Sequence, residues 1–374
     1  MGMAHERFSA EVYRSRLQRA QQLTASAGLS ALFITPGPDL RYLTGSRAST
    51  FERLTALVIS PDRDPQVVVP RLELAALRES AVGELGLVVH EWVDGQDPYA
   101  IAVEAAGVSA GRYGVSDAAP ALHTVPLAAR FGSSPELATG VLRQLRMIKD
   151  DAEIDALRRA GAAIDRVHAR VGEWLSAGRT EREVATDIEA AIVAEGHTGA
   201  EFIIVGSGPN GADPHHEVSD RVIEDGDVVV VDIGGPVEPG YNSDCTRTYC
   251  VGEPSGEMAR QYRILEEAQR AAVAAVRPGV SAQQIDAAAR DVLAEAGLAD
   301  KFVHRTGHGI GLSVHEEPYI VEGNDIELQV GMAFSVEPGI YFPGGWGARI
   351  EDIVVVTADG CESLNQRPHE LKSV

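Results

Sequence analysis

The second half of the chain contains an internal repeat, which limits the possible folds more than any other feature of the sequence. Residues 178–184 read GRTEREV and residues 279–285 read GVSAQQI. In both, Thr or Ser comes two residues after a glycine, and Glu or Gln comes three residues after that Thr or Ser. This is the capping-box pattern of a helix start. The two predicted helices extend to Gly196 and Gly297, since glycine commonly ends a helix.

The repeat continues into two apolar segments that each contain an acid. Residues 226–235 read GDVVVVDIGG and residues 331–340 read GMAFSVEPGI, so that Asp232 and Glu337 occupy matching places. Self-similarity of this kind indicates two equivalent structural units. We therefore predict two βααβ-type halves of about 100 residues each, which face one another across a pseudo-two-fold axis.

The first part of the chain has a different pattern. A helix is expected over residues 9–27, and short apolar strands then alternate with helical segments, which is typical of an α/β unit. At 374 residues the chain is also too long for one ordinary core. We predict an α+β protein with two domains, an α/β domain over residues 1–142 and the duplicated domain over residues 143–374. The first long helix of the duplicated domain is expected to begin with a capping box of Asp150 and Glu153.

Composition and charge exclude several classes of protein. The net charge is -22, whereas binding to nucleic acid or to an anionic membrane requires a basic surface. The sequence has no apolar run of about 18 residues and no signal peptide, so we expect a cytoplasmic protein. The three cysteines, Cys245, Cys250 and Cys361, lack the spacing of a zinc or redox pair and are expected to be structural.

Five polar residues interrupt apolar segments of the duplicated domain. They are Asp232, Asp244, His308, Glu337 and Glu351. Four carboxylates that converge in a buried place would repel one another and would have to take up protons unless cations neutralise them. Two divalent metal ions would balance the four negative charges. Four carboxylates and one imidazole, without a thiolate, favour Mn²⁺ or Co²⁺ over a structural zinc, although Zn²⁺ can occupy such sites.

Further histidines occur in two segments of the same domain. His215 and His216 lie in ADPHHEVSD, and His304 and His315 flank His308 in FVHRTGHGIGLSVHEEP. A two-metal hydrolase needs groups beyond its ligands to donate hydrogen bonds to the tetrahedral intermediate and to move protons, and neutral histidines can do this near pH 7. The spacing alone does not choose among them.

Two other features are expected to have no catalytic role. Residues 206–211 read GSGPNG, which matches a dinucleotide-binding fingerprint, but the polar residues and Pro214 that follow do not start a helix. We interpret this segment as a tight loop that delivers His215. His168 stands alone on the helix that follows Asp150, and a satisfied or exposed helix histidine is expected there.

These residues resemble the pita-bread metallopeptidases, which include methionine aminopeptidase, aminopeptidase P and prolidase. The resemblance covers nearly the whole chain and implies a creatinase-like N-terminal domain followed by a pita-bread catalytic domain. The metal ligands of this family are Asp, Asp, His, Glu and Glu in chain order, and the five residues above match that order without a gap. The motifs RMIK, PHH and ARIED resemble the proline-specific branch, and the chain as a whole is similar to mycobacterial dipeptidases of this family.

The resemblance also implies roles for individual residues. His215 and His315 would bind substrate or stabilise the transition state, His304 would line the same pocket, and Arg349 would be a further pocket residue. The predicted enzyme is a homodimeric Xaa-Pro dipeptidase that acts on small peptides. A hydroxide that bridges the two metal ions would attack the scissile carbonyl, with Glu337 as proton shuttle.

Three alternatives remain open from the sequence. An aminopeptidase P would remove the N-terminal residue of longer Xaa-Pro peptides. A methionine aminopeptidase shares the motifs GHGIG and HEEP but usually lacks an N-terminal domain of this size. A non-catalytic binding protein could keep the fold, although such proteins generally lose metal ligands and all five are present here.

Overall fold

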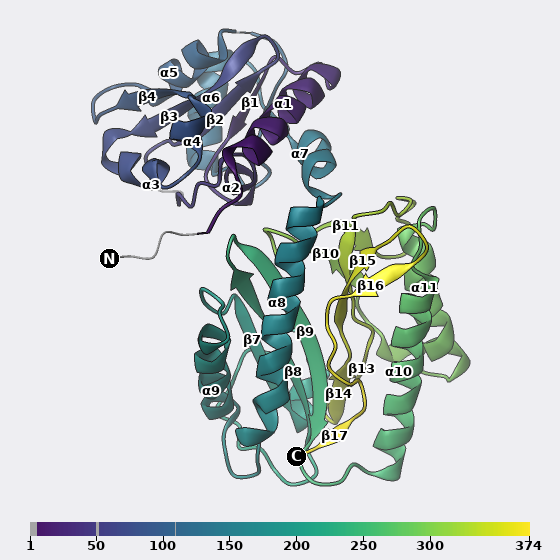
Figure 1. Ribbon diagram of the computed structural model, residues 1–374. Helices are drawn as coiled ribbons and strands as arrows, with labels where there is room; N and C mark the ends of the chain where they lie inside the picture. Colours follow the sequence, from purple (N-terminus) through teal and green to yellow (C-terminus); the bar gives the residue numbers. More distant parts are fainter. Residues whose placement is uncertain (1–5, 50–51, 109) are drawn as a thin grey trace. The chain divides into compact units, whose positions relative to one another are not determined.

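The computed structural model describes residues 6–49, 52–108 and 110–374. The chain divides into two compact units, residues 1–146 and residues 147–374 (Figure 1). Helix α7 (Thr139–Arg146) spans the position at which the sequence predicts a boundary, after residue 142, and that boundary stays a prediction. Each unit is described by itself below.

The first unit contains a six-stranded sheet with the strand order β4-β3-β2-β1-β5-β6. Strand β1 pairs antiparallel with β2 and parallel with β5, so the sheet is mixed, as the predicted alternation of strands and helices allows. Its strands are β1 (Ala31–Ile34), β2 (Ala56–Ser60), β3 (Arg63–Pro70), β4 (Val88–Trp92), β5 (Tyr113–Val115) and β6 (Glu136–Leu137). Its other helices are α1 (Ala10–Ser26), α2 (Pro38–Thr44), α3 (Leu74–Arg78), α4 (Val82–Leu85), α5 (Pro98–Ala106) and α6 (Ala121–Phe131), with a 3-10 helix η1 (Arg71–Glu73).

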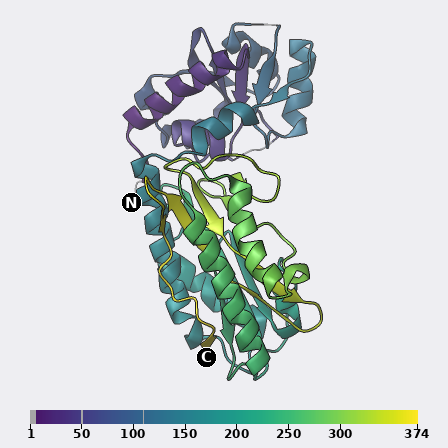
Figure 2. The same ribbon diagram turned by 90° about the vertical axis from the view of Figure 1, so that its right-hand side faces the viewer.

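The second unit consists of two groups of strands, each flanked by a pair of long helices. Figure 1 shows α8 and α9 beside the first group and α10 and α11 beside the second, and Figure 2 shows the pair α10 and α11 face on. The first sheet has the order β17-β9-β8-β7, and the second has the order β11-β10-β12-β15-β16. Strands β13 and β14 form a separate hairpin between β12 and β15 in the chain.

The bounds of these elements follow the chain in order. The first half contains α8 (Asp151–Arg170), η2 (Val171–Glu173), α9 (Glu181–Ala194), β7 (Phe202–Ser207), η3 (Gly208–Ala212), β8 (Val228–Val237) and β9 (Tyr241–Cys250). The second half contains α10 (Gly256–Ala275), α11 (Ala282–Glu295), η4 (Ala299–Lys301), β10 (Gly307–Gly309), β11 (Glu316–Ile320), β12 (Ala333–Val336), β13 (Gly339–Phe342), β14 (Trp346–Arg349), β15 (Asp352–Val356), β16 (Cys361–Ser363) and β17 (Lys372–Ser373).

The predicted helix starts are confirmed. Reciprocal capping-box hydrogen bonds form at the starts of α8, α9 and α11, with Asp150, Thr180 and Ser281 as the N-cap residues. The α-helices α9 and α11 end just before Gly196 and Gly297, which both have positive φ angles. The repeat in the sequence therefore corresponds to a repeat in the structure. The helix starts could be predicted because a capping box needs only contacts between residues that are close in the chain.

The two faces of β8 pack against different groups of side chains. Val229, Val231 and Ile233 belong to the core that α8 and α9 cover, whereas Val228 belongs to the core of the second half. Because side chains alternate along a strand, Asp232 lies on the same face as Val228 and is directed away from α8 and α9. The run of four valines is buried on both faces.

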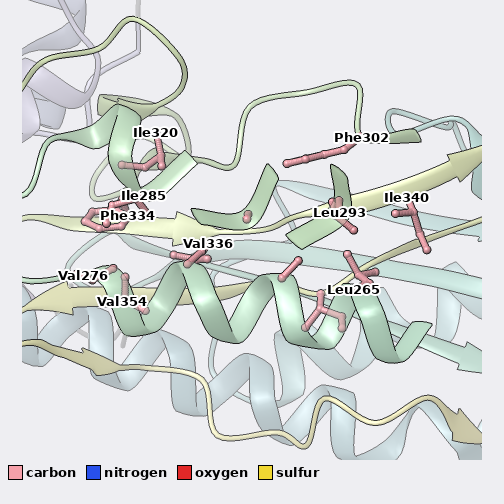
Figure 3. Packing of buried hydrophobic residues seen from close by; sticks show 14 of the residues in the cluster. Leu265, Val276, Ile285, Leu293, Phe302, Ile320, Phe334, Val336, Ile340 and Val354 are labelled. Atoms are coloured by element: carbon pink, nitrogen blue, oxygen red, sulfur yellow. The ribbon is translucent and has the colours of Figure 1, made fainter. Parts of the chain in front are cut away.

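The core of the second half lies between its helices and its sheet. Figure 3 shows Leu265 of α10, Leu293 of α11, Val336 of β12 and Val354 of β15, which belong to one buried cluster that extends along α10. These side chains are all fully buried. Glu337 directly follows Val336, so this core holds the strand end from which that acid extends.

Two further expectations can be compared with the structure. The three cysteines are free thiols, and Cys245 and Cys250 are buried. In the described ranges of the chain, no helix is both long and apolar enough to cross a membrane.

A valine in this core should contribute far more to stability than an exposed one. Replacing Val354, which is fully buried, with alanine should lower the free energy of unfolding by about 2 kcal/mol, because it removes two buried methyl groups and leaves a cavity. The same replacement at Val330, which is 53% exposed, should change it by less than about 0.5 kcal/mol. Urea unfolding of both variants measures the difference, and equal losses would contradict this description of the core.

Candidate active site

The first two acids of the predicted site lie on the hairpin of β8 and β9. In this antiparallel pair Asp232 is opposite Thr246, and Asp244 is opposite Gly234. Asp244 and Thr246 are two residues apart and share a face, so Asp232 and Asp244 are diagonal neighbours on one face of the hairpin. Both residues are buried, with exposed fractions of 8% and 3%.

The other two acids lie at one end of the pairing between β12 and β15. Val336 is opposite Asp352 in that antiparallel pair, and Glu337 and Glu351 are the residues just beyond it. The backbone N–H of Glu351 donates to the carbonyl of Thr246 over 3.2 Å, and the Thr246 hydroxyl donates to Glu351 Oε2 over 2.8 Å. These two bonds connect the halves where their acids meet.

His308, on β10, completes the group. Its Nδ1 donates a hydrogen bond to the carbonyl of Gly309 over 3.1 Å, so Nε2 is the nitrogen that can bind a metal ion once it has lost its proton. That Nε2 lies 3.2 Å from Glu337 Oε1 and 3.6 Å from Asp244 Oδ2. Among the described residues, Asp244, His308 and Glu351 each offer a ligand atom within 4.8 Å of the other two.

The buried carboxylates have strongly altered pKa values. Burial raises the pKa of Asp232, Asp244 and Glu351, and the negative charges of neighbouring carboxylates raise it further. For Glu337, burial also raises the pKa, but the hydrogen bond with His308 and the nearby charges of His308, His304 and Arg349 outweigh it and lower the pKa to about 2. This group of acids therefore needs more positive charge to stay ionised.

Two carboxylate oxygens support the same conclusion. Within the described part of the chain, no hydrogen-bond donor reaches Asp232 Oδ1 or Glu351 Oε1, although both atoms are buried. Buried acceptors are normally satisfied, and a bound cation is one way to satisfy them. Oxygen atoms from four carboxylates and one imidazole nitrogen are suitable ligands for hard or borderline divalent ions. The residues present therefore fit two divalent metal ions.

Two of the predicted pocket residues contact one another through a tyrosine. The Arg349 guanidinium donates to the hydroxyl of Tyr341 over 2.8 Å, and it also forms an ion pair with Asp232. His304 Nε2 lies 2.8 Å from the same hydroxyl, and its Nδ1 lies 2.7 Å from the carbonyl of Arg305. Both ring nitrogens of His304 are thus engaged within the protein, and burial as the main cause lowers its pKa to about 4.

The other two predicted histidines border the same group. The rings of His315 and His308 meet edge to face, with centroids 4.2 Å apart. Desolvation lowers the pKa of His315 to about 4, with further contributions from the charges of His308 and His215 among its neighbours. His215 is exposed and near enough to influence His315 electrostatically. The structure thus gathers His215, His304 and His315 around the predicted metal ligands.

Several contacts of the site were not predicted from the sequence. They involve Tyr341, the hydroxyl of Thr246, and Ser335, whose hydroxyl donates to Glu337 Oε1 over 2.9 Å. The only sequence signal for Thr246 is its place in SDCTRTY, two residues after Asp244 on the same strand face. Tyr341 has no such signal, because its partners Arg349 and His304 come from other segments.

The two features that were predicted to be non-catalytic have structural explanations. The first two residues of GSGPNG end β7 and the rest lie in the 3-10 helix η3, and no α-helix follows before β8, so no helix N-terminus is present for a pyrophosphate. His168 is buried, and its two nitrogens lie 3.0 Å from the Tyr249 hydroxyl and 3.0 Å from the carbonyl of Cys245. It is therefore a satisfied core histidine, one of the two possibilities expected.

Comparison with known proteins identifies the family. Residues 155–358, more than half of the chain, match the model of metallopeptidase family M24, and residues 16–148 match the Creatinase/Prolidase N-terminal domain. The chain belongs to metallopeptidase family M24. The predicted family resemblance and fold class are thereby confirmed: this is a metallopeptidase with a creatinase-like N-terminal domain and a pita-bread catalytic domain. Membership of this family implies divalent metal ions.

Three relatives of this M24 protein show how far the similarity extends. A probable dipeptidase PepE from Mycobacterium tuberculosis is 65% identical over 369 residues, which cover 99% of this chain and 98% of the relative. The crystal structure of dipeptidase PepE from Mycobacterium ulcerans matches with a TM-score of 0.95 and 64% identity, covering 99% of this chain and all of that one. An Xaa-Pro dipeptidase from Lactobacillus helveticus is 33% identical over 366 residues, 96% of this chain and 98% of the relative.

The raised carboxyl pKa values predict how metal ions stabilise the protein at different pH. In the metal-free protein these groups have a higher pKa when folded than when unfolded, so they favour the folded state at low pH, and this contribution is lost as the pH rises through their folded pKa. Bound metal replaces the protons. The rise in unfolding temperature on adding Mn²⁺ should therefore be larger at about pH 8 than at about pH 5.5, by roughly 3 °C or more.

Differential scanning fluorimetry with and without Mn²⁺ measures this effect, with a chelator in the metal-free samples at each pH. The difference between the paired samples removes the pH dependence of groups elsewhere in the chain. A stabilisation that is equal at both pH values, or larger at the lower one, would contradict a metal centre built on these carboxylates.

Proposed function

We propose that the protein is a two-metal Xaa-Pro dipeptidase, which releases the N-terminal residue from dipeptides with proline in second place. The observation that carries the proposal is the convergence of three buried carboxylates, the partly buried carboxylate of Glu337 and the Nε2 of His308, with two carboxylate oxygens that lack a donor in the described chain. Full-length similarity to a protein named Xaa-Pro dipeptidase supports the substrate class. The homodimer and the cytoplasmic location stay predictions.

The metal ligands of this proposal are Asp232, Asp244, His308, Glu337 and Glu351. Mn²⁺ is our first choice because the donor set is rich in oxygen and has no thiolate, and Co²⁺ or Zn²⁺ could occupy the same site. When bound, the two ions would lower the pKa of a water molecule and polarise the scissile carbonyl.

The residues around the ions would supply the proton transfers and the charge stabilisation. Glu337, with a pKa of about 2 in the metal-free chain, is ionised at neutral pH and can accept the proton of the attacking water and pass it to the leaving nitrogen. The pKa of His315 is about 4, so at neutral pH its ring is uncharged and its N–H can donate to the oxyanion that develops on the carbonyl. His215, on the loop between β7 and β8, would also donate a hydrogen bond to this oxyanion.

Specificity for proline must come from shape, because the nitrogen of an Xaa-Pro bond carries no hydrogen and cannot donate a hydrogen bond. His304 and Arg349 are the residues that we propose for the wall of this pocket. Their mutual contacts through Tyr341 support the proposal, because an engaged and immobile wall recognises shape better than a flexible one.

The substrate class can be tested with a small peptide panel. Metal-free protein reconstituted with Mn²⁺ should hydrolyse Ala-Pro, whereas the metal-free protein should not. The tripeptide Ala-Pro-Ala should be cleaved at least about tenfold more slowly in kcat/KM if a dipeptide is preferred. Failure to cleave any Xaa-Pro substrate with Mn²⁺ or Co²⁺ would refute the proposal, and faster cleavage of the tripeptide would indicate an aminopeptidase P instead.

The ligand assignment can be tested on one residue of the hairpin. Replacing Asp244 with alanine should remove bound metal, as measured by isothermal titration calorimetry, and should reduce turnover of Ala-Pro by about 10³-fold or more, because the remaining carboxylates no longer form the full ligand set. The matched control is Asp291→Ala on α11, which removes an exposed aspartate of the same unit. Normal metal binding by the Asp244 variant would show that the assignment is wrong.

A further inference from the structure

The loop that carries His215 connects β7 to the segment before β8. It leaves β7 at Ser207, passes through η3, and returns beside its own starting point at Ser219. It includes all but the first residue of the GSGPNG motif, which resembles a nucleotide-binding fingerprint but has no role in the function proposed above. The contacts of this loop indicate a different purpose for the motif.

Both ends of the loop are held by one buried carboxylate, that of Glu181. Glu181 is the first residue of α9 and its side chain is completely buried. Its Oε1 accepts hydrogen bonds from the N–H (2.8 Å) and hydroxyl (2.7 Å) of Ser207 and from the amide of Asn210 (3.0 Å). Its Oε2 accepts from the N–H (3.2 Å) and hydroxyl (2.6 Å) of Ser219 and lies 2.8 Å from His216 Nε2.

The middle of the loop contacts the candidate metal centre. The carbonyl of Pro214 accepts a hydrogen bond from Arg349 Nη1 over 3.4 Å, and the backbones of Gly211 and Gly347 approach so closely that a Cβ on Gly347 would overlap Gly211. His215 therefore lies between Pro214, which contacts Arg349, and His216, which contacts Glu181. Its own N–H donates to the Asp213 side chain over 3.1 Å. The backbone on both sides of His215 is fixed, while its ring remains exposed.

The start of α9 does not by itself need a buried acid at this position. Thr180 and Glu183 already satisfy the helix start as a capping box, and the corresponding residue of the repeat, Ala282 of α11, has no charge. An exposed acid in the first turn would interact with the helix dipole equally well. The hydrogen bonds to Glu181 instead come mainly from the loop, which points to a role outside its own helix.

The second half contains a comparable contact made by a residue at a different helix position. Asp286 of α11 is buried, and it accepts hydrogen bonds from the N–H (3.0 Å) and the hydroxyl (2.7 Å) of Thr306. Thr306 lies between His304 and His308 in the chain. In each half, a buried acid on a helix therefore holds a segment that contains histidines of the site.

We propose that Glu181 is a positioning residue that holds the loop of residues 207–219 so that His215 is directed toward the substrate at the metal centre. This inference rests on the proposed function, because it assigns to Glu181 the orientation of a residue that contacts substrate there. Glu181 remains ionised in this environment: burial raises its pKa, but hydrogen bonds from Ser219 and Ser207 outweigh burial and lower it. A charged acceptor forms stronger hydrogen bonds than a neutral one, which suits an anchor for a loop of this length.

A double-mutant cycle with Glu181→Gln and His215→Ala tests the inference. Glutamine keeps the shape of the side chain but presents an NH₂ group to donors, so the loop should loosen. With Mn²⁺-loaded enzyme and Ala-Pro as substrate, Glu181→Gln alone should lower kcat/KM by about tenfold or more. In the His215→Ala background the same replacement should lower it by less than about twofold, because the group that Glu181 positions is already absent.

The matched control is Glu183→Gln, which changes the same helix end at a carboxylate that accepts its hydrogen bonds from Thr180. It should leave kcat/KM unchanged in both backgrounds. Hydrogen exchange of the metal-free protein gives a readout that does not depend on activity: peptides from residues 207–219 should exchange faster in Glu181→Gln than in Glu183→Gln. If Glu181→Gln does not fold, Ser219→Ala, which removes one donor to the same carboxylate, replaces it in the cycle and in the exchange experiment.

The outcomes separate the inference from the function on which it rests. If His215→Ala lowers kcat/KM and Glu181→Gln lowers it by the same factor in both backgrounds, Glu181 does not act through His215 and the inference is overturned, while the dipeptidase proposal stands. Unchanged exchange of the loop in Glu181→Gln would also overturn it. If His215→Ala has no effect on kcat/KM, the role of His215 in the proposed function fails together with the inference.

Discussion

The repulsion between buried carboxylates is the constraint on which the rest of this structure depends. Asp244 and Glu351 are 3% and 1% exposed, and burial together with the charges of Asp232 and Glu337 raises the pKa of both, because little water is present to screen the charge. Arg349 compensates in part through its ion pair with Asp232. Divalent ions would neutralise the remaining charge and satisfy the two oxygens that no donor of the described residues reaches, so the metal requirement of the family follows from the geometry of the side chains.

The packing around the site provides the free energy that holds these like charges together. The alternation of side chains along β8 places Val229 and Val231 in the core beneath α8 and α9, and it directs Asp232 to the opposite face. On the other side Glu337 extends from the end of β12, whose Val336 is anchored in the core of the second half (Figure 3). Each half contributes two acids, and the bonds between Thr246 and Glu351 connect them.

The centre and the periphery of the site are constructed differently. The acids at the centre occupy matching positions of the repeat, as Asp232 and Glu337 do. The histidine segments around them are held by acids that do not match: Glu181 in the first turn of α9, and Asp286 further along α11. A duplicated fold therefore presents an asymmetric surface to a substrate, and an asymmetric surface is needed because the two sides of a peptide bond differ chemically.

The sequence by itself determined the local structure and the identity of the central residues. Capping boxes such as that of Thr180 involve neighbours three residues apart, so their hydrogen bonds can be inferred from the order of residues. The acids were found because a buried charge in an apolar strand is costly and therefore rarely occurs without a partner. The tertiary structure alone decided the contacts of Tyr341 with Arg349 and His304, and of Glu181 with Ser219. Those partners come from separate segments, and only the packing of the elements brings them within hydrogen-bonding distance.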